Sequence, residues 1–86
     1  MTHYRVTSWD IIDSTPGDPW TCPVARAINR KHRWPLRACV MGDEIELEIF
    51  RLWTVKRAKA PAVVSSFIAR YDLAKPITSF DFELEW

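Results

Sequence analysis

Hydrophobic and polar residues alternate most regularly at the end of the chain. Over residues 79–86 the apolar side chains point one way and the polar ones the other, which is the pattern of a half-buried strand. The apolar set is Phe80, Phe82, Leu84 and Trp86, and the polar set is Ser79, Asp81, Glu83 and Glu85. Residues 4–7 alternate in the same way and predict a first strand.

The middle of the chain predicts a hairpin. Residues 36–41 form a strand, Gly42-Asp43 a two-residue turn, and residues 44–49 a second strand that buries Ile45, Leu47 and Ile49. The alternation changes phase at Phe50, so we expect a bulge or bend near residues 50–51. Residues 52–55 predict a further short strand, and residues 56–60 a basic connection.

Three segments have helix signals. Residues 7–13 predict a single helical turn, because Ser or Thr before Asp is typical of a helix start. Thr21 or Cys22 can cap a helix that begins at Pro23, buries one apolar side and ends at Trp34-Pro35. Another helix runs from Pro61 to about residue 74, where Lys75-Pro76 stops it. The apolar positions of these two helices are Val24, Ala27 and Ile28, then Val64, Phe67, Ile68 and Tyr71.

The predicted order is β-α-β-β-(β)-α-β, an α+β fold in a single domain spanning residues 1–86. A single antiparallel sheet with the two helices on one face would bury both helix stripes, which is the ferredoxin-like, or split βαβ, arrangement. The other sheet face would then be exposed and acidic. It would carry Glu44, Glu46, Glu48, Asp81, Glu83 and Glu85.

Composition excludes several classes of protein. The chain of 86 residues has only two glycines, so a glycine-rich phosphate loop cannot form. No apolar run reaches the ~20 residues of a membrane helix, and the first residues lack the apolar stretch of a signal peptide, so we expect a cytoplasmic protein. Cys22, Cys39, His3 and His32 show no metal-binding spacing, so we expect no metal and no cofactor.

The charges are segregated although the net charge is only +1. Nine of the 12 basic residues lie in residues 26–37 and 51–59, and seven of the 11 acidic residues lie in residues 43–48 and 81–85. The separated signs fit solvated faces, a basic site for an anion, or a self-complementary dimer. So small a net charge speaks against generic binding of duplex nucleic acid. Trp53 and Trp86 are hard to bury in one short chain and favour a homo-oligomer.

The candidate ligand site lies at the start of the helix that follows Pro23. Its free N–H groups suit a phosphate or carboxylate, arginines spaced by four and three residues add positive charge, and a tryptophan could stack on a base. The predicted ligand-binding residues are Trp20, Thr21, Cys22, Arg26, Arg30 and Arg33. Cys22 is either a packed cap or a reactive thiol, but His32 lies ~15 Å further along the helix axis. We therefore predict no catalytic residues and no enzyme.

Several short motifs recur together in one group of proteins. They are Asp-Ile-Ile at residues 10–12, Cys-Pro-Val-Ala-Arg-Ala-Ile at 22–28, Phe-Ile-Ala-Arg-Tyr-Asp at 67–72, Lys75-Pro76, and Phe-Asp-Phe-Glu-Leu at 80–84. The chain resembles a family of small bacteriophage proteins that have a Cys-Pro-[Val/Ile]-Ala helix start and a C-terminal Phe-x-Phe strand. The resemblance implies a phage origin and a host-cytoplasm setting, and it implies no catalytic residues.

Two functions remain in view. The first is a phage accessory protein, without enzymatic activity, that counters host defence by sequestering a small anionic, nucleotide-like ligand. The second is an inhibitor that uses the acidic sheet face to block a host defence protein or a host nucleic-acid-processing protein. The partners expected are therefore a small anion or a host protein, with no membrane.

Overall fold

The computed structural model describes residues 2–14, 18–41, 43–73 and 78–86. Within them the chain forms five strands and three helices, so the predicted α+β class is confirmed. In chain order the elements are β1 (Thr2–Val6), α1 (Ser8–Ile12), α2 (Pro23–Lys31), β2 (Leu36–Met41), β3 (Glu44–Ile49), β4 (Trp53–Lys59), α3 (Ala62–Asp72) and β5 (Phe80–Leu84).

The strands form two antiparallel sheets. β1 pairs with β5 from Thr2 opposite Leu84 to Val6 opposite Phe80, and the second sheet has the order β2-β3-β4. The predicted single sheet is therefore not what these strands build, and the ferredoxin-like topology is not confirmed. The outer edge of β2 explains why, since Val40 N–H donates to the Pro19 carbonyl and Ala38 N–H donates to Asn29 Oδ1. Those two bonds occupy the positions that another strand would use.

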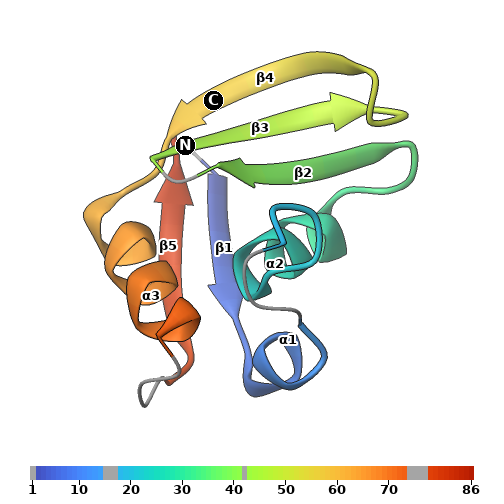
Figure 1. Cartoon of the computed structure of the whole chain (residues 1–86). Coiled ribbons are helices and arrows are strands. Elements are labelled where there is room, and N and C mark those ends of the chain that lie inside the picture. Colours follow the sequence, from blue (N-terminus) through green and yellow to red (C-terminus); the bar gives the residue numbers. More distant parts are fainter. Residues whose placement is uncertain (1, 15–17, 42, 74–77) are drawn as a thin grey trace.

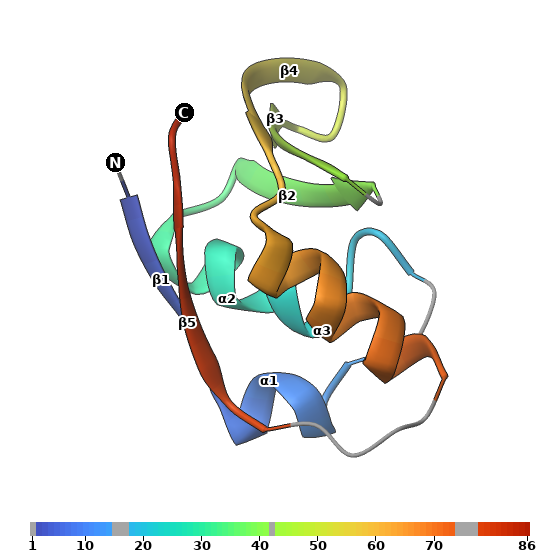
Figure 2. The ribbon, with the colours of Figure 1, turned by 90° about the vertical axis from the view of Figure 1, so that its left-hand side faces the viewer.

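The two sheets run in crossing directions, and α2 and α3 lie between them, with α1 at the far end of β1 (Figure 1 and Figure 2). β1 and β5 run side by side. The strands of the β2-β3-β4 sheet run across one end of this pair. Turned by 90°, the β1–β5 pair is seen edge-on with all three helices on one side of it (Figure 2). Both chain ends lie at the same end of that pair in the two views.

The core lies where both sheets meet α2 and α3. The apolar faces predicted for the strands and helices are largely confirmed, since Phe82, Leu84, Ile45, Leu47 and most of the helix stripes are buried, although Phe80, Ile49, Ile68 and Tyr71 are only half-buried. The fully buried side chains come from six different elements, which ties the two sheets into one core. The largest of them are Ile28, Ile45, Leu84, Val6, Val24 and Val64.

Trp86 follows β5 and is packed rather than exposed. It lies against the core, and its Nε1–H donates to the Tyr4 hydroxyl over 3.0 Å. Its ring meets the Tyr4 ring edge-on at 6.4 Å. Trp86 therefore gives no reason for an oligomer, whereas Trp53 is 63% exposed, as the sequence predicted.

The predicted helix starts are confirmed. Thr7 caps α1 through a capping box in which Asp10 N–H donates to Thr7 Oγ1 and Thr7 N–H donates to Asp10 Oδ2. Cys22 caps α2, and its Sγ accepts from Ala25 N–H at 3.5 Å. α2 ends at Lys31 rather than at Trp34, because His32 is extended and its Nε2 lies 2.8 Å from the Tyr4 hydroxyl.

The bend predicted near residues 50–51 is confirmed, but the strand after it is longer than predicted. Residues 50 and 51 form a turn in which both backbones are left-handed, with φ of 54° at Phe50 and 57° at Arg51. The β-bulge lies further from this turn, within the paired strands. Leu47 faces Lys56 and Glu48 faces Thr54, so the extra residue is Val55 in β4. The segment predicted as a basic connection is therefore mostly strand, because β4 continues to Lys59. The predicted Gly42-Asp43 turn falls partly outside the described residues.

The residues of the predicted acidic face are largely paired with bases. Across β1 and β5, His3 lies within 4 Å of Asp81 and Glu83, and Arg5 Nε lies 3.6 Å from Asp81. Across β3 and β4, Arg57 Nε lies 3.6 Å from Glu44 and 3.5 Å from Glu46. Glu46 is only 7% exposed, and the Thr54 hydroxyl donates to it. The prediction of one exposed acidic face is therefore wrong, because antiparallel pairing sets basic residues opposite the acidic ones.

Candidate functional site

A cavity of about 410 Å³ opens beside α2. Residues of α1, α2, β2, the segment before α2 and the β3–β4 turn contribute to it, so it joins parts of the chain that are far apart in sequence. Four arginines line it, and Asp10 is the single acidic residue in the described lining. The lining residues are Asp10, Trp20, Thr21, Arg26, Asn29, Arg30, Arg37 and Arg51.

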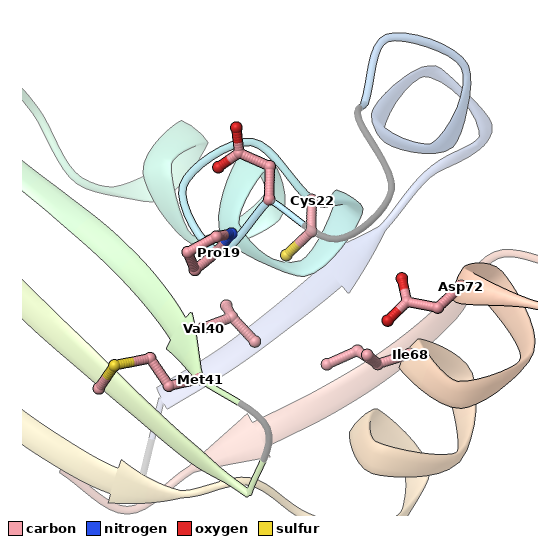
Figure 3. Close-up of a pocket in the computed structure, with 7 residues that line it drawn as sticks. Pro19, Cys22, Val40, Met41, Ile68 and Asp72 are labelled. Atoms are coloured by element: carbon pink, nitrogen blue, oxygen red, sulfur yellow. The ribbon is translucent and has the colours of Figure 1, made fainter.

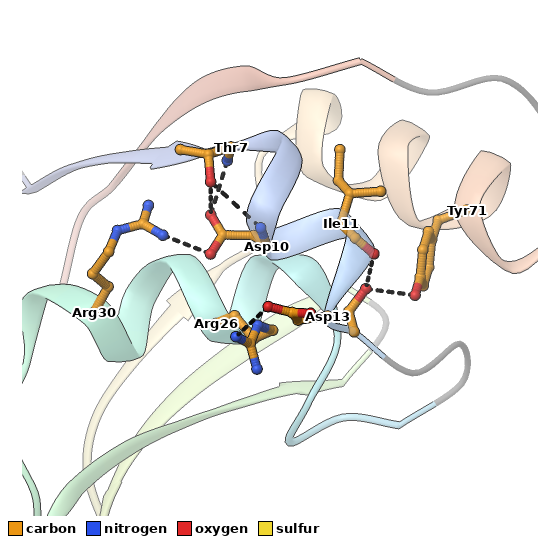
Figure 4. Close-up of polar contacts among 8 residues, drawn as sticks. Thr7, Asp10, Ile11, Asp13, Arg26, Arg30 and Tyr71 are labelled. Atoms are coloured by element: carbon orange, nitrogen blue, oxygen red, sulfur yellow. Dashed lines mark hydrogen bonds and ion pairs between the residues drawn. The ribbon is translucent and has the colours of Figure 1, made fainter.

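Arg30 is held in place by the main chain and by Asp10. Its Nη1 donates to Asp10 Oδ1 at 2.5 Å (Figure 4). Its Nη2 donates to the carbonyl of Arg5 at 2.6 Å. Asp10 is 4% exposed. Burial opposes its ionisation, but the hydrogen bonds from Arg30 and Thr7 outweigh burial, and the pKa of Asp10 lies below its ordinary value. Arg30 is thus largely committed to the fold, and it fixes α1 against α2.

Arg26 is less tightly held than Arg30. Its Nη2 lies 3.8 Å from Asp13 Oδ2, which is too long for a hydrogen bond, and Asp13 is exposed (Figure 4). Its Nε is buried and has no hydrogen-bond partner within the described structure, and the same holds for Thr21 Oγ1. Buried polar atoms are nearly always hydrogen-bonded. Thr21 and Arg26 line the cavity, but these two atoms have almost no accessible surface and lie beneath it.

Trp20 and Arg51 form a stacked pair in the lining. The Arg51 guanidinium carbon lies 5.0 Å from the centre of the Trp20 ring. Asp18 positions Trp20, because its Oδ1 accepts from the Trp20 N–H at 2.8 Å. Arg51 reaches this place from the left-handed turn between β3 and β4, and among the described residues no carboxylate pairs with it. Its charge is therefore free for a ligand.

Arg37 of β2 is the fourth arginine. Its Nη1 donates to its neighbour Leu36 at the carbonyl oxygen, over 2.7 Å, and its guanidinium carbon lies 5.0 Å from the centre of the Trp34 ring. Within the described residues, neither contact neutralises its charge. Arg37 and Arg51 are consequently the two lining arginines without an acidic partner in that part of the chain.

The cavity contains four of the six predicted ligand-binding residues: Trp20, Thr21, Arg26 and Arg30. Cys22 and Arg33 do not line it. The helical spacing of four and three residues holds only to Lys31, where α2 ends, so Arg33 leaves the predicted stripe. The sequence analysis missed four further lining residues, namely Asp10, Asn29, Arg37 and Arg51. These four residues reach the cavity only because elements far apart in sequence pack together. The change of alternation at Phe50 did indicate the turn that carries Arg51.

Cys22 belongs to a different cavity, of about 300 Å³, between the segment before α2, the end of β2 and α3 (Figure 3). Burial raises the pKa of its thiol, hydrogen bonds from the start of α2 partly oppose that shift, and the Asp72 and Asp18 carboxylates add a smaller rise. Burial and neighbouring carboxylates, Glu48 foremost, raise the pKa of Cys39 to about 11. A nucleophilic cysteine needs the opposite shift. The arrangement therefore favours a packed capping role for Cys22.

Both histidines contact residues of the β1–β5 pair. His3 faces Asp81 and Glu83 on the β1–β5 pair, and His32 lies against Tyr4. In the described part of the chain, no three His, Cys, Asp or Glu side chains are grouped to hold a metal ion. None of the helices described here is long and apolar enough to cross a membrane.

The arginine cavity can bind an anion that carries more than one charge. Arginine presents a planar fork of donors that matches phosphate oxygens, and the Trp20 ring offers a flat apolar surface for a planar group. Asp10 is the one carboxylate among the described lining residues, and it is tied to Arg30 and Thr7. The chemistry that these residues support is recognition of a phosphate joined to a ring.

Comparisons with protein-family models, with curated proteins and with solved structures find no match for this chain.

Proposed function

We propose that this protein binds a small anionic, nucleotide-like ligand in the arginine cavity and leaves it chemically unchanged. Four arginines converge on one cavity whose described lining contains one acidic residue. That convergence is the observation that carries the proposal. Like charges gathered this closely repel one another, and a bound anion relieves the repulsion.

The size of the cavity supports a small ligand rather than a duplex. A volume of about 410 Å³ is at the lower end of the ~300–1,000 Å³ range of ligand cavities. A protein that follows a duplex backbone needs a wide basic surface, whereas here several bases outside the cavity are paired with acids. The arginines therefore concentrate their charge at a single point.

The resemblance to small bacteriophage proteins extends the proposal. In the cytoplasm of an infected host, a protein that holds a nucleotide tightly and without turnover would withdraw it from a defence system. The second candidate, an inhibitor that acts through an acidic face, lacks support, because Arg5, His3 and Arg57 pair with the carboxylates that would form this face.

Titration calorimetry against a panel of nucleoside mono-, di- and triphosphates and pyrophosphate tests the proposal. We expect at least one nucleotide to bind, and its affinity to fall as the salt concentration rises. Replacing either unpaired arginine, Arg37→Gln or Arg51→Gln, should weaken binding roughly tenfold, because each removes a charge-assisted hydrogen bond.

Arg33→Gln is the matched control. Arg33 is exposed and lies outside the cavity, so this variant loses the same charge without touching the site. An equal loss of affinity in all three variants would show a diffuse charge effect and contradict the proposal. Absence of heat with every member of the panel at low salt would also contradict it.

A further inference from the structure

A second tryptophan–arginine pair lies beside the cavity. The Arg37 guanidinium carbon is 5.0 Å from the centre of the Trp34 ring, the same distance that joins Arg51 to Trp20. Phe50 meets Trp34 edge-on, with 6.1 Å between the ring centres and 76° between the planes. Trp34 is nevertheless 58% exposed, so part of its surface is open to solvent.

Arg37 connects this second pair to the cavity. It lines the cavity and also stacks on Trp34, so a ligand that contacts Arg37 from inside lies next to the Trp34 ring. The cavity has a volume of about 410 Å³, close to the ~300 Å³ at which the range of ligand cavities begins. It is therefore too small to enclose two nucleotide units. A second unit would have to lie on the adjoining surface, where Trp34 is.

We propose that the site takes two linked nucleotides. The first base stacks at Trp20 inside the cavity, the second stacks on Trp34 outside it, and Arg37 holds the phosphate that joins them. Aromatic rings interleaved with arginines are the usual means of binding successive bases without reading their sequence. This inference rests on the proposed function, since it extends the same cavity.

Calorimetry with adenosine monophosphate and with the 5′-phosphorylated dinucleotide pApA tests the inference. Because a second stacked base adds affinity, we expect pApA to bind roughly tenfold more tightly than the monophosphate. In Trp34→Ala the ratio of the two affinities should fall to about one, because the second base has lost its stacking surface. Equal affinity for the two ligands in the unaltered protein would overturn the inference and leave the proposed function standing.

Trp53→Ala is the matched control. Trp53 is 63% exposed, pairs with Ile49 in the sheet register, and has no arginine stacked on it in the described structure. We expect this variant to keep the preference for pApA, and loss of the preference here as well as in Trp34→Ala would contradict a specific role for Trp34. Failure of both ligands to bind would instead overturn the proposed function for adenine nucleotides.

The two linked units could be a free dinucleotide or the end of a longer strand. A 5′-phosphorylated oligoadenylate of greater length separates these sources, because both present the same phosphate and the same first two bases. Affinity equal to that of pApA identifies a strand end as the ligand. Much weaker binding than pApA identifies a free dinucleotide. Much tighter binding would show further contacts along the strand and overturn the limit of two units.

Discussion

Asp10 shows how one residue serves both the fold and the site. It closes the α1 capping box with Thr7 and also accepts from Arg30, so a single carboxylate connects α1 to α2 (Figure 4). A buried carboxylate is costly unless it is paired and hydrogen-bonded, and both conditions are met here. Asp10 fixes the position of Arg30 in the lining. Its main effect is therefore on the shape of the cavity rather than on the charge of the cavity.

The variant Asp10→Asn should be less stable by about 2 kcal/mol at neutral pH, since it loses a charged hydrogen bond and weakens a cap. The folded pKa of Asp10 is below the ordinary 3.8, so its stabilisation is complete above that value and is lost as the pH falls through the folded pKa. Urea unfolding across this range should show the gap between the two proteins closing in acid.

Asp13→Asn is the comparison for that measurement. Asp13 is exposed and its pair with Arg26 is 3.8 Å long, so its replacement should change stability little. A gap between Asp10→Asn and the unaltered protein that stays constant into strong acid would show that the ionised carboxylate is not the source of the stability.

At the scale of single residues, the sequence predicted those site members that lie on one continuous segment. Trp20, Thr21, Arg26 and Arg30 follow one another before and along α2, so helix periodicity was enough to group them. Arg37 and Arg51 come from β2 and from a turn, and nothing local marks them as neighbours of Trp20. Their position depends on how the hairpin packs against α2. The hydrophobic periodicity of a single element carries no information about that packing.

At the scale of elements, the turn after β3 is the most unusual part of the chain. Phe50 and Arg51 both have left-handed backbones, a conformation that costs a residue with a Cβ about 1 kcal/mol or more. Two-residue turns of this kind normally contain Gly, Asn or Asp. Keeping Arg51 there sets its side chain over Trp20 in the cavity. The strain therefore lies at the candidate site, as is common for functional residues.

The variant Arg51→Gly should gain about 1 kcal/mol of stability, because glycine adopts this backbone conformation without a steric cost. It should at the same time lose affinity for the nucleotide that the unaltered protein binds, since the arginine over Trp20 is gone. Thermal unfolding and calorimetry on the same samples measure the two effects.

Phe50→Gly relieves the same kind of strain and keeps Arg51, so it should retain most of the affinity for adenosine monophosphate. Its stability gain should be smaller, because the edge contact with Trp34 is lost. If Arg51→Gly were less stable than the unaltered protein, the left-handed turn would not be a source of strain.

Most helices and strands were predictable from hydrophobic periodicity and helix-capping residues. The arrangement of the strands into two sheets was not. Strand alternation and helix stripes placed seven of the eight elements, and extended the eighth, β4, too little. The number of sheets depends on which partner occupies each strand edge. Asn29 and Pro19 occupy the β2 edge through single hydrogen bonds, and neither residue type signals that role in sequence.

At the scale of the whole molecule, cross-strand pairing disperses the charge that the sequence shows as blocks. Acidic β3 and β5 each lie beside a strand that supplies bases, so carboxylates and cations alternate over both sheets. In the arginine cavity Arg26 and Arg30 also face carboxylates, whereas Arg37, from a strand, and Arg51, from a turn, have no acidic partner among the described residues. A concentrated positive site thus exists in a protein whose net charge is +1.

The exposed part of β4 argues for association between copies of this chain. β4 is the edge strand of its sheet, and near its start Leu52 is 71% and Trp53 63% exposed, with Val55 also exposed. An edge strand with apolar side chains and unpaired backbone groups is prone to pair with another strand. We expect a two-fold dimer formed by this end of β4, because lysines and an arginine protect the other end of the strand.

Sedimentation velocity over a range of concentrations tests this association. The unaltered protein should be dimeric at high concentration, and Trp53→Glu should be monomeric, because the charge would be buried at the two-fold axis without a partner. Trp9→Glu places the same charge on α1, where Trp9 is 71% exposed, and should leave the dimer intact. A monomer at every concentration would exclude the β4 dimer, and dissociation by both substitutions would show that the copies associate without a specific edge.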